Sequence, residues 1–183
     1  IISSLFMAYF ISTHIKNSKW ILSGNLVPMV LPISTLIVLW NTILDKNGFL
    51  NKILGYPVGN GIEWIDSKYA MIVLIVLFMW RNMGFATVLW VAGITTIPTQ
   101  IIDASKIDGA NTMQRLFLII CPNLDYCFLS ILVLSFTNSL KIYRESYFLA
   151  GKYPNQSIYM LQNIFNNWFH DLQISNIAAG SLI

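Results

Sequence analysis

The chain has 183 residues, of which 56% are hydrophobic and 10% are charged, whereas ordinary soluble domains carry about 25% charged residues. This composition and a mean hydropathy of +0.63 exclude a disordered chain. They favour a membrane protein, because a soluble globule would leave too much apolar surface in water. The net charge of +3 comes from 11 basic and 8 acidic residues scattered along the chain. Without a basic stripe to follow a phosphate backbone, no nucleic-acid partner is expected.

The first part of the chain predicts one partial and one complete membrane span. Residues 1–15 resemble the truncated end of a spanning helix. Residues 21–44 follow with 24 positions and no charge, which is enough helix to cross a hydrocarbon core of about 30 Å. Pro28 and Pro32 lie inside this span, and each removes a backbone hydrogen bond. One spanning helix with a kink is therefore predicted.

Two further spans follow, with a possible partial one at the end of the chain. The second is predicted over residues 69–97, interrupted by Arg81 and Asn82. The third is predicted over residues 124–141, and residues 172–183 resemble the start of another helix. Small residues in the second span predict close helix packing; they are Gly84, Ala86, Ala92 and Gly93.

The expected fold is all-α, a polytopic bundle of transmembrane helices that forms a single domain over residues 1–183. The chain begins at Ile1 without a methionine and stops at Ile183 within an apolar run, so we expect a fragment of a longer protein. Residues 45–68 are predicted to be a turn-rich solvent loop. Residues 141–171 are rich in Tyr, Asn and Gln, which suits the membrane interface.

Residues 98–122 have helical periodicity between two prolines and predict a helix-turn-helix outside the bilayer. Pro98 suits a first helical position, and Gly109 is placed to end the first helix. Asn111 is placed to cap a second helix, with Gln114 three residues later as in a capping box. The predicted apolar faces consist of Ile101, Ile102, Ala104 and Ile107 in the first helix and Leu116, Phe117 and Ile120 in the second.

The spacing in this segment resembles a known motif. Asp103-Ala104-Ser105, then Gly109 after three residues, Ile119 after nine more, and Cys121-Pro122 are similar to Glu-Ala-Ala-x3-Gly-x9-Ile-x-Leu-Pro in the permeases of ABC importers. The string ASKIDGANTMQRLF over residues 104–117 resembles the carbohydrate-uptake branch, similar to maltose- and glycerol-3-phosphate-type permeases. Residues 80–98 and 143–154 resemble the same branch. Asp103, Ser105 and Cys121 stand where that pattern has Glu, Ala and Leu.

This resemblance implies a permease subunit that carries a sugar or oligosaccharide delivered by an extracytoplasmic solute-binding protein. The implied partners are a dimer of ABC ATPase subunits, a second homologous permease and the lipid bilayer of the plasma membrane, which the chain would cross several times. The 98–122 loop is implied to dock on an ATPase in the cytoplasm. The implied coupling residues are Asp103, Ala104, Ser105, Asp108, Gly109, Ala110, Gln114, Phe117 and Pro122.

No catalytic chemistry is indicated within the chain. It contains no Gly-x-x-x-x-Gly-Lys-Ser/Thr loop, so ATP and Mg²⁺ are expected on the partner ATPase and no cofactor is expected here. His14 and His170 are too isolated to form a metal site. The chain is therefore expected not to be an enzyme.

Charge and resemblance disagree about orientation. With residues 98–122 in the cytoplasm, four basic residues lie inside and six lie outside, whereas the positive-inside rule favours the reverse. The resemblance is the more specific signal. We therefore expect Ser105 in the cytoplasm and Asn51 and Asn155 outside.

Arg81 is the most costly residue in the predicted spans, because a charge near a span centre is unfavourable by about 2.5–3.5 kcal/mol. It either lines the substrate path with Asn82 or is accommodated by a neighbouring helix or the interface. Asn138, as an amide for a polyol, and Tyr143, as an aromatic face for a sugar ring, are further candidates for this path.

Alternatives remain open from the residues alone. The coupling motif is shared more widely than the substrate, so a permease for an amino acid or a peptide also fits. A membrane channel or scaffold without an ATPase fits the apolar spans. Arg144 and Glu145 are expected either as a solvated ion pair or as a contact for the binding protein.

Overall fold

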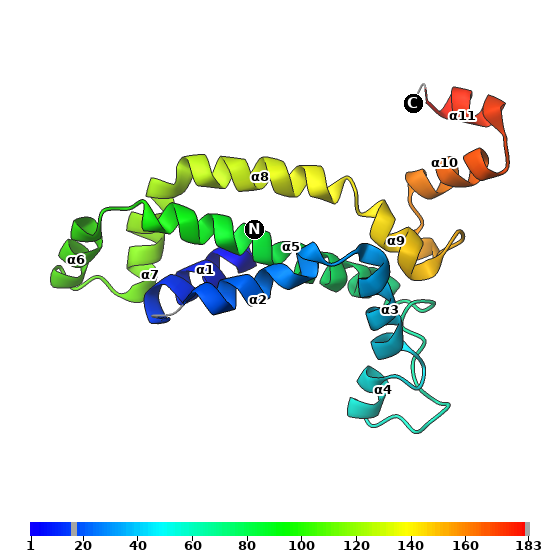
Figure 1. The fold of residues 1–183 in the computed structure, drawn as a ribbon, viewed down its shortest axis with the longest axis horizontal. Helices are drawn as coiled ribbons and strands as arrows, with labels where there is room; N and C mark the ends of the chain where they lie inside the picture. The colour runs from blue at the N-terminus through cyan, green and yellow to red at the C-terminus, as the bar shows by residue number, and fades with distance from the viewer. Residues whose placement is uncertain (16–17, 182–183) are drawn as a thin grey trace. The chain divides into compact units, whose positions relative to one another are not determined.

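The computed structural model describes residues 1–15 and 18–181, and these residues form helices and connecting segments without a strand (Figure 1). The chain divides into two compact units. The first comprises Ile1–Val30 and Trp80–Ser139, and the second comprises Leu31–Met79 with the chain from Leu140 onward. The predicted all-α class is confirmed.

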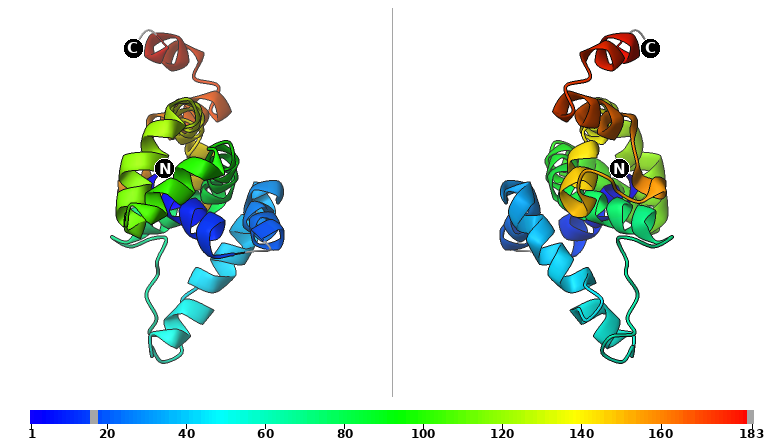
Figure 2. Two further views of the ribbon diagram at one scale, coloured as in Figure 1. Left: turned by 90° about the vertical axis from the view of Figure 1, so that its left-hand side faces the viewer. Right: turned by 90° about the vertical axis from the view of Figure 1, so that its right-hand side faces the viewer.

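The first unit contains α1 (Ile2–His14), α2 (Ser18–Val30), the second part of α5 (Ala70–Thr95) and α8 (Asp125–Ser139). Between α5 and α8 lies the segment predicted to be a helix-turn-helix. Figures 1 and 2 show α8 running alongside the green part of α5. Gly93 explains this approach, since a Cβ there would lie 2.9 Å from the Cys127 sulfur.

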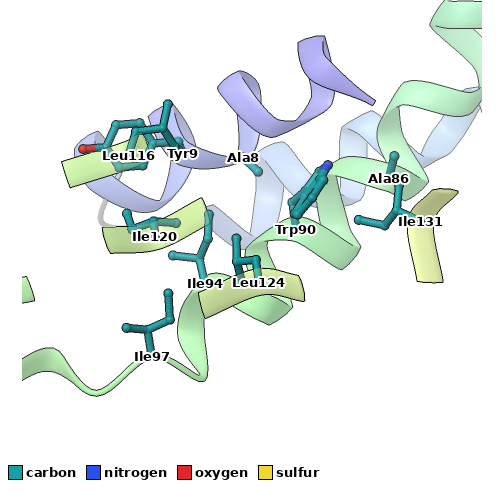
Figure 3. Packing of buried hydrophobic residues seen from close by; sticks show 10 residues of the cluster. All are labelled: Ala8, Tyr9, Ala86, Trp90, Ile94, Ile97, Leu116, Ile120, Leu124 and Ile131. Carbon is teal, nitrogen blue, oxygen red and sulfur yellow. The ribbon is translucent and has the colours of Figure 1, made fainter. Parts of the chain in front are cut away.

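One hydrophobic core holds this unit together (Figure 3). It joins α1, α5, α8 and the segment before α8. Trp90 and Ile94 contribute from α5, and Leu116 and Ile120 pack from the connecting segment. The complete set of buried members is Ala8, Tyr9, Ala86, Trp90, Ile94, Ile97, Leu116, Ile120, Leu124 and Ile131.

The prediction of one kinked helix over residues 21–44 is wrong. α2 ends at Val30, and a separate helix, α3, begins at Ile33 and ends at Leu44. Pro32 is the N-cap of α3 and has the extended ψ of 140°. Proline lacks an N–H and disfavours helical geometry in the preceding residue, so two helices replace the expected kink. Pro28, by contrast, lies inside α2.

Two helical stretches of the described chain are long and apolar enough to cross a membrane. They are Ala70–Thr95, with 26 residues, and Thr112–Ala150, with 39 residues. The broken pair Lys19–Val30 and Ile33–Ile53 raises the number to three if it counts as one span. The bounds of α5 lie close to those of the predicted 69–97 span, and α8 lies within the predicted 124–141 span.

The second unit contains α3, α4 (Phe49–Ile53), the first part of α5, α9 (Tyr143–Ala150), the short helix η3 (Gln156–Ile158), α10 (Leu161–His170) and α11 (Ile174–Gly180). The 141–171 segment is thus largely helical. Within the predicted 172–183 partial span, the helical part is α11, Ile174–Gly180. Residues 182–183 lie outside the described residues.

Residues 45–68 are not merely a solvent loop, because Asn51 organises them from a position that is only 1% exposed. Its Nδ2 donates to the carbonyl oxygens of Asp45, Lys46 and Ile62 at 2.9–3.2 Å. Its Oδ1 accepts from the Ile62 N–H and from the Trp64 indole, both at 3.1 Å. One buried amide therefore closes the loop upon itself.

Candidate functional site

The predicted coupling segment begins with α6 (Thr99–Ile107), for which Pro98 is the N-cap rather than the first helical residue. The predicted apolar stripe of this helix is not buried as one face. Ser105 is 5% exposed, whereas Ile107 is 86% and Ile101 is 43% exposed. α6 therefore turns a small hydroxyl residue toward the unit and presents isoleucines to its surroundings.

A tight turn ends α6, and Gly109 makes it possible. Gly109 has a φ of +77°, a region that side chains with a Cβ rarely adopt. The Gly109 N–H donates to Lys106 O at 3.2 Å, and the Ala110 N–H donates to Ser105 O at 3.0 Å. These two bonds form a Schellman motif, with Asp108 as the C-cap. The predicted helix stop at Gly109 is confirmed.

The second helix, α7 (Thr112–Gln114), starts with the predicted capping box. The Gln114 N–H donates to Asn111 Oδ1, and the Asn111 N–H donates to Gln114 Oε1, each at 2.8 Å. This arrangement satisfies two backbone donors that a helix start would otherwise leave open. The Gln114 side chain, predicted as a coupling residue, is thus engaged within the loop.

The chain then continues as a π-helix, η1 (Arg115–Ile120), and a 3-10 turn, η2 (Cys121–Leu124), with Pro122 in its first turn. Leu116 and Ile120 are buried as predicted, but Phe117 is 54% exposed. Phe117 cannot share the face of Leu116, because successive helical side chains are about 100° apart. It packs edge-on against Phe6 of α1, with 6.3 Å between ring centroids.

The acidic residues of the segment are exposed. Asp103 Oδ1 accepts from Lys106 Nζ at 2.8 Å, an ion pair one turn along the same helix. Both side chains are more than half exposed. Ala104 and Asp108 are exposed as well, and Ala110 is half-buried. The loop therefore carries its acidic groups on its outer surface.

A hydrogen bond from outside the motif anchors the loop to the first unit. The Tyr9 hydroxyl of α1 donates to Thr112 O at 3.0 Å, although the two residues are 103 positions apart. Together with Leu116 and Ile120 in the core, this bond fixes the start of the second helix against α1 and α5. Sequence reasoning missed Tyr9, and its only signal was a phenol within an apolar run.

Among the predicted path residues, Asn82 and Asn138 are brought together. Asn138 Nδ2 donates to Asn82 Oδ1 at 3.2 Å, linking α8 to α5. Arg81 precedes Asn82 on α5 and is half-buried. Tyr143 belongs to the second unit, where its ring lies 5.8 Å from that of Tyr147.

Glu145 is buried, although the sequence predicted a solvent-exposed carboxylate. It is only 3% exposed, so the prediction of a solvated ion pair is wrong for its carboxylate. Arg144 is exposed. The sequence hides this burial because the neighbours of Glu145 along the chain are polar, and only the packing of α9 encloses it. No group of three potential metal ligands occurs among the residues that the structure describes.

The family model described as binding-protein-dependent transport system inner membrane component matches residues 1–182. The chain belongs to this family. It is therefore a membrane component of a transport system, which agrees with its apolar helices.

Similar members of the family include two sugar-related permeases. One is the xylose/arabinose import permease protein XacH of Haloferax volcanii, 27% identical over 159 residues that make up 85% of this chain and 50% of XacH. Another is the sulfoquinovosyl glycerol transport system permease protein SmoG of Agrobacterium fabrum, 28% identical over 84% of this chain and 52% of SmoG. The chain spans about half the length of these relatives.

A solved structure supports the fold. It is described as the crystal structure of a bacterial ABC transporter involved in the import of the acidic polysaccharide alginate. The alignment covers 98% of this chain and 68% of the other chain, with a TM-score of 0.66 and 18% sequence identity. The family membership and this likeness agree on a helical transporter fold.

Proposed function

We propose that the chain is part of a permease subunit of an ATP-driven ABC importer, and that its 98–122 loop docks on a separate ATPase. One observation carries this proposal: hydrogen bonds within the loop hold its shape, yet the loop exposes large apolar side chains beside its acidic residues. Ile101, Ile107 and Met113 are all more than 40% exposed, and Asp103 and Asp108 flank them. Apolar anchors within a polar rim are typical of a protein-docking surface.

The hydrogen bonds within the loop make it suitable for transmitting a movement of the ATPase to the membrane helices. The Schellman motif at Gly109 and the capping box at Asn111 hold α6 and α7 in a fixed relation. Leu116 and Ile120 continue from α7 into the core of α1 and α5. A push on α6 would therefore move these helices as a body, which is how rigid-body coupling between subunits works. In this mechanism ATP and Mg²⁺ are bound by the partner ATPase.

The proposed cargo is a sugar or oligosaccharide. The names of XacH and SmoG, which refer to xylose/arabinose and to sulfoquinovosyl glycerol, support this class. The Asn82 and Asn138 amides offer groups that can hydrogen-bond a polyol. Arg81, in the same unit, is the other proposed contributor to the path. The remaining proposed partners are a second homologous permease and an extracytoplasmic solute-binding protein. The plasma membrane is the proposed location of both permeases.

The decisive experiment separates docking from membrane insertion. Ile107→Asp places a charge in the outer apolar surface of α6, so the ATPase should no longer co-purify with the full permease and ATP-driven sugar uptake into vesicles should stop. Val58→Asp is the matched control, since Val58 is 80% exposed and lies in the second unit. It should retain both activities.

Two results would overturn the proposal. Ile107→Asp that retains the ATPase and full uptake would make the loop a passive connector. Sugar flux without ATP would indicate a channel. ATP-driven uptake of amino acids or peptides, with no uptake of sugars, would keep the permease but change its cargo.

A further inference from the structure

A cavity of about 290 Å³ lies between the end of α1, the end of α5, α6 and the π-helix. All of its lining residues belong to the first unit. Its volume is close to the lower end of that of small-ligand sites, which hold about 300–1,000 Å³. Ser105 is the one predicted coupling residue in its lining, and no residue of the proposed sugar path lines it.

The charge of the cavity is positive. Arg115 and Lys106 line it, and no acidic residue does. Lys106 is neutralised by Asp103 on the outer side of α6. The Nε of Arg115 is buried and has no hydrogen-bond partner within the described residues. A buried guanidinium donor without an acceptor is unfavourable, so the cavity is suited to an anion that supplies one.

The rest of the lining is divided between hydroxyls and branched alkyl groups. Ser12 of α1 and Thr112 of α7 are among the hydroxyl residues of the lining. Ile94, Ile102 and Ile120 contribute apolar surface. The combination suits a ligand with an anionic head and an apolar remainder. The basic and hydroxyl groups can bind the head, and the isoleucines can bury the apolar part.

The position of the cavity also restricts the ligand. α5 is an apolar helix that ends at Thr95, beside the cavity residue Ile94, and α6 starts four residues later. The cavity thus lies where an apolar helix gives way to a polar loop, which is the level of lipid headgroups. An Arg fork matches the geometry of a phosphate group.

We infer that this cavity binds the phosphate group of an anionic phospholipid, with Arg115 as its main donor. The bound lipid would hold α1, α5 and α6 together at the base of the loop. The exposed isoleucine Ile107 is not part of the lining, so the lipid and the proposed ATPase do not compete for it. The inference rests on membrane location and is independent of the cargo and of the ATPase.

The test uses the full permease in nanodiscs made from equimolar phosphatidylglycerol and phosphatidylcholine. After gentle transfer to detergent, mass spectrometry of the intact protein should show retained phosphatidylglycerol in excess over phosphatidylcholine. Arg115→Gln should lower that retention at least about fivefold, the effect of removing one basic contact. Arg144→Gln, the matched control at an exposed arginine of the second unit, should retain as much as the wild type.

A second measurement needs no variant and covers a failure of Arg115→Gln to fold. Photoactivatable phosphatidylglycerol should cross-link wild-type protein at peptides from residues 94–120, and excess unlabelled phosphatidylglycerol should prevent this. Inorganic phosphate serves as a second competitor. If it prevents the cross-link as well as unlabelled phosphatidylglycerol does, the cavity is a site for a free anion and not for a lipid. Equal losses in both Arg variants, or cross-links confined to other peptides, would overturn the inference.

Discussion

The backbone of Gly84 in α5 lies directly against the backbone of Asn25 in α2. A Cβ atom at position 84 would overlap the Asn25 carbonyl oxygen and would lie 2.6 Å from its carbonyl carbon. The two helices therefore meet at this point without a side chain between them. The small residues of α5 had predicted close packing of this kind.

Gly84→Ala should destabilise the protein. The added methyl group forces the two backbones apart, and overpacking of this type costs about 1–3 kcal/mol. The measurement is the midpoint of thermal unfolding in detergent. Gly24→Ala is the control, because nothing lies within 4 Å of a Cβ at that position of α2. Its midpoint should stay the same or rise slightly, since alanine favours helix; an equal fall in both variants would contradict the packing argument.

Gly109→Val should uncouple the loop by changing the turn after α6. No atom lies within 4 Å of a Cβ at position 109, so the cost comes from the φ of +77° alone. For a residue with a Cβ this cost is about 1–2 kcal/mol, and it is greatest for a β-branched side chain. Co-purification of the ATPase and ATP-driven uptake should both fall. Gly109→Asn should retain them, because asparagine tolerates positive φ; a loss as large as that of valine would assign Gly109 a contact role.

Asp103→Ala should separate docking from folding. The exposed pair with Lys106 contributes at most about 1 kcal/mol, so the unfolding midpoint should change little. If the carboxylate also contacts the ATPase, its loss should weaken association by about 1–3 kcal/mol, the range for a charge-assisted hydrogen bond. Titration of purified ATPase against the permease measures this effect. Asp103→Glu should keep the affinity, and unchanged binding by the alanine variant would remove Asp103 from the interface.

Asn82 and Asn138 can be tested together. A double-mutant cycle with alanine should give a coupling of about 0.6 kcal/mol, rising to about 1.7 kcal/mol at most, as for other hydrogen bonds between membrane helices. A purely structural bond would change stability and leave the KM for sugar unaltered. Contact with the cargo predicts a higher KM in both single variants, measured as uptake against sugar concentration.

The orientation of the chain in the membrane can be tested by labelling single cysteines. Ser105 and Asn51 are unsuitable positions for these cysteines, because both residues are buried. Ala104, Val58 and Gln156 are exposed alternatives. Single cysteines at 58 and 156, with Cys121 and Cys127 replaced, should react with a membrane-impermeant thiol reagent in intact cells. A cysteine at 104 should react only after the cells are opened. Reaction at 104 alone in intact cells would reverse the proposed topology.

Features that depend on a few neighbouring residues could be predicted from the sequence. The capping box needs only Asn111 and Gln114 at the correct spacing, and the turn needs only a glycine at position 109. Both are local arrangements in which backbone and side chain satisfy one another. Close packing of α5 was also predictable from its small residues, although the sequence did not identify α2 as the neighbour.

Features that depend on distant partners could not be predicted. Asn51 is buried because Ile62 and Trp64 fold back onto it, and Glu145 is buried because α9 packs into its unit. Phe117 followed the apolar pattern but lies outside the core, since the position of α1 decides which side of the π-helix is covered. The break at Pro32 was underestimated, because proline alone does not determine whether a helix bends or ends.

The π-helix at Arg115–Ile120 has a consequence for insertions and deletions. Each of its hydrogen bonds encloses one residue more than those of an α-helix. Loss of one residue there can be absorbed by tightening into α-helix, which leaves the faces of α8 unchanged. The same loss within α8 would rotate every later side chain by about 100°. The junction between the loop and its span can therefore lose one residue with less effect on the later side chains than α8 can.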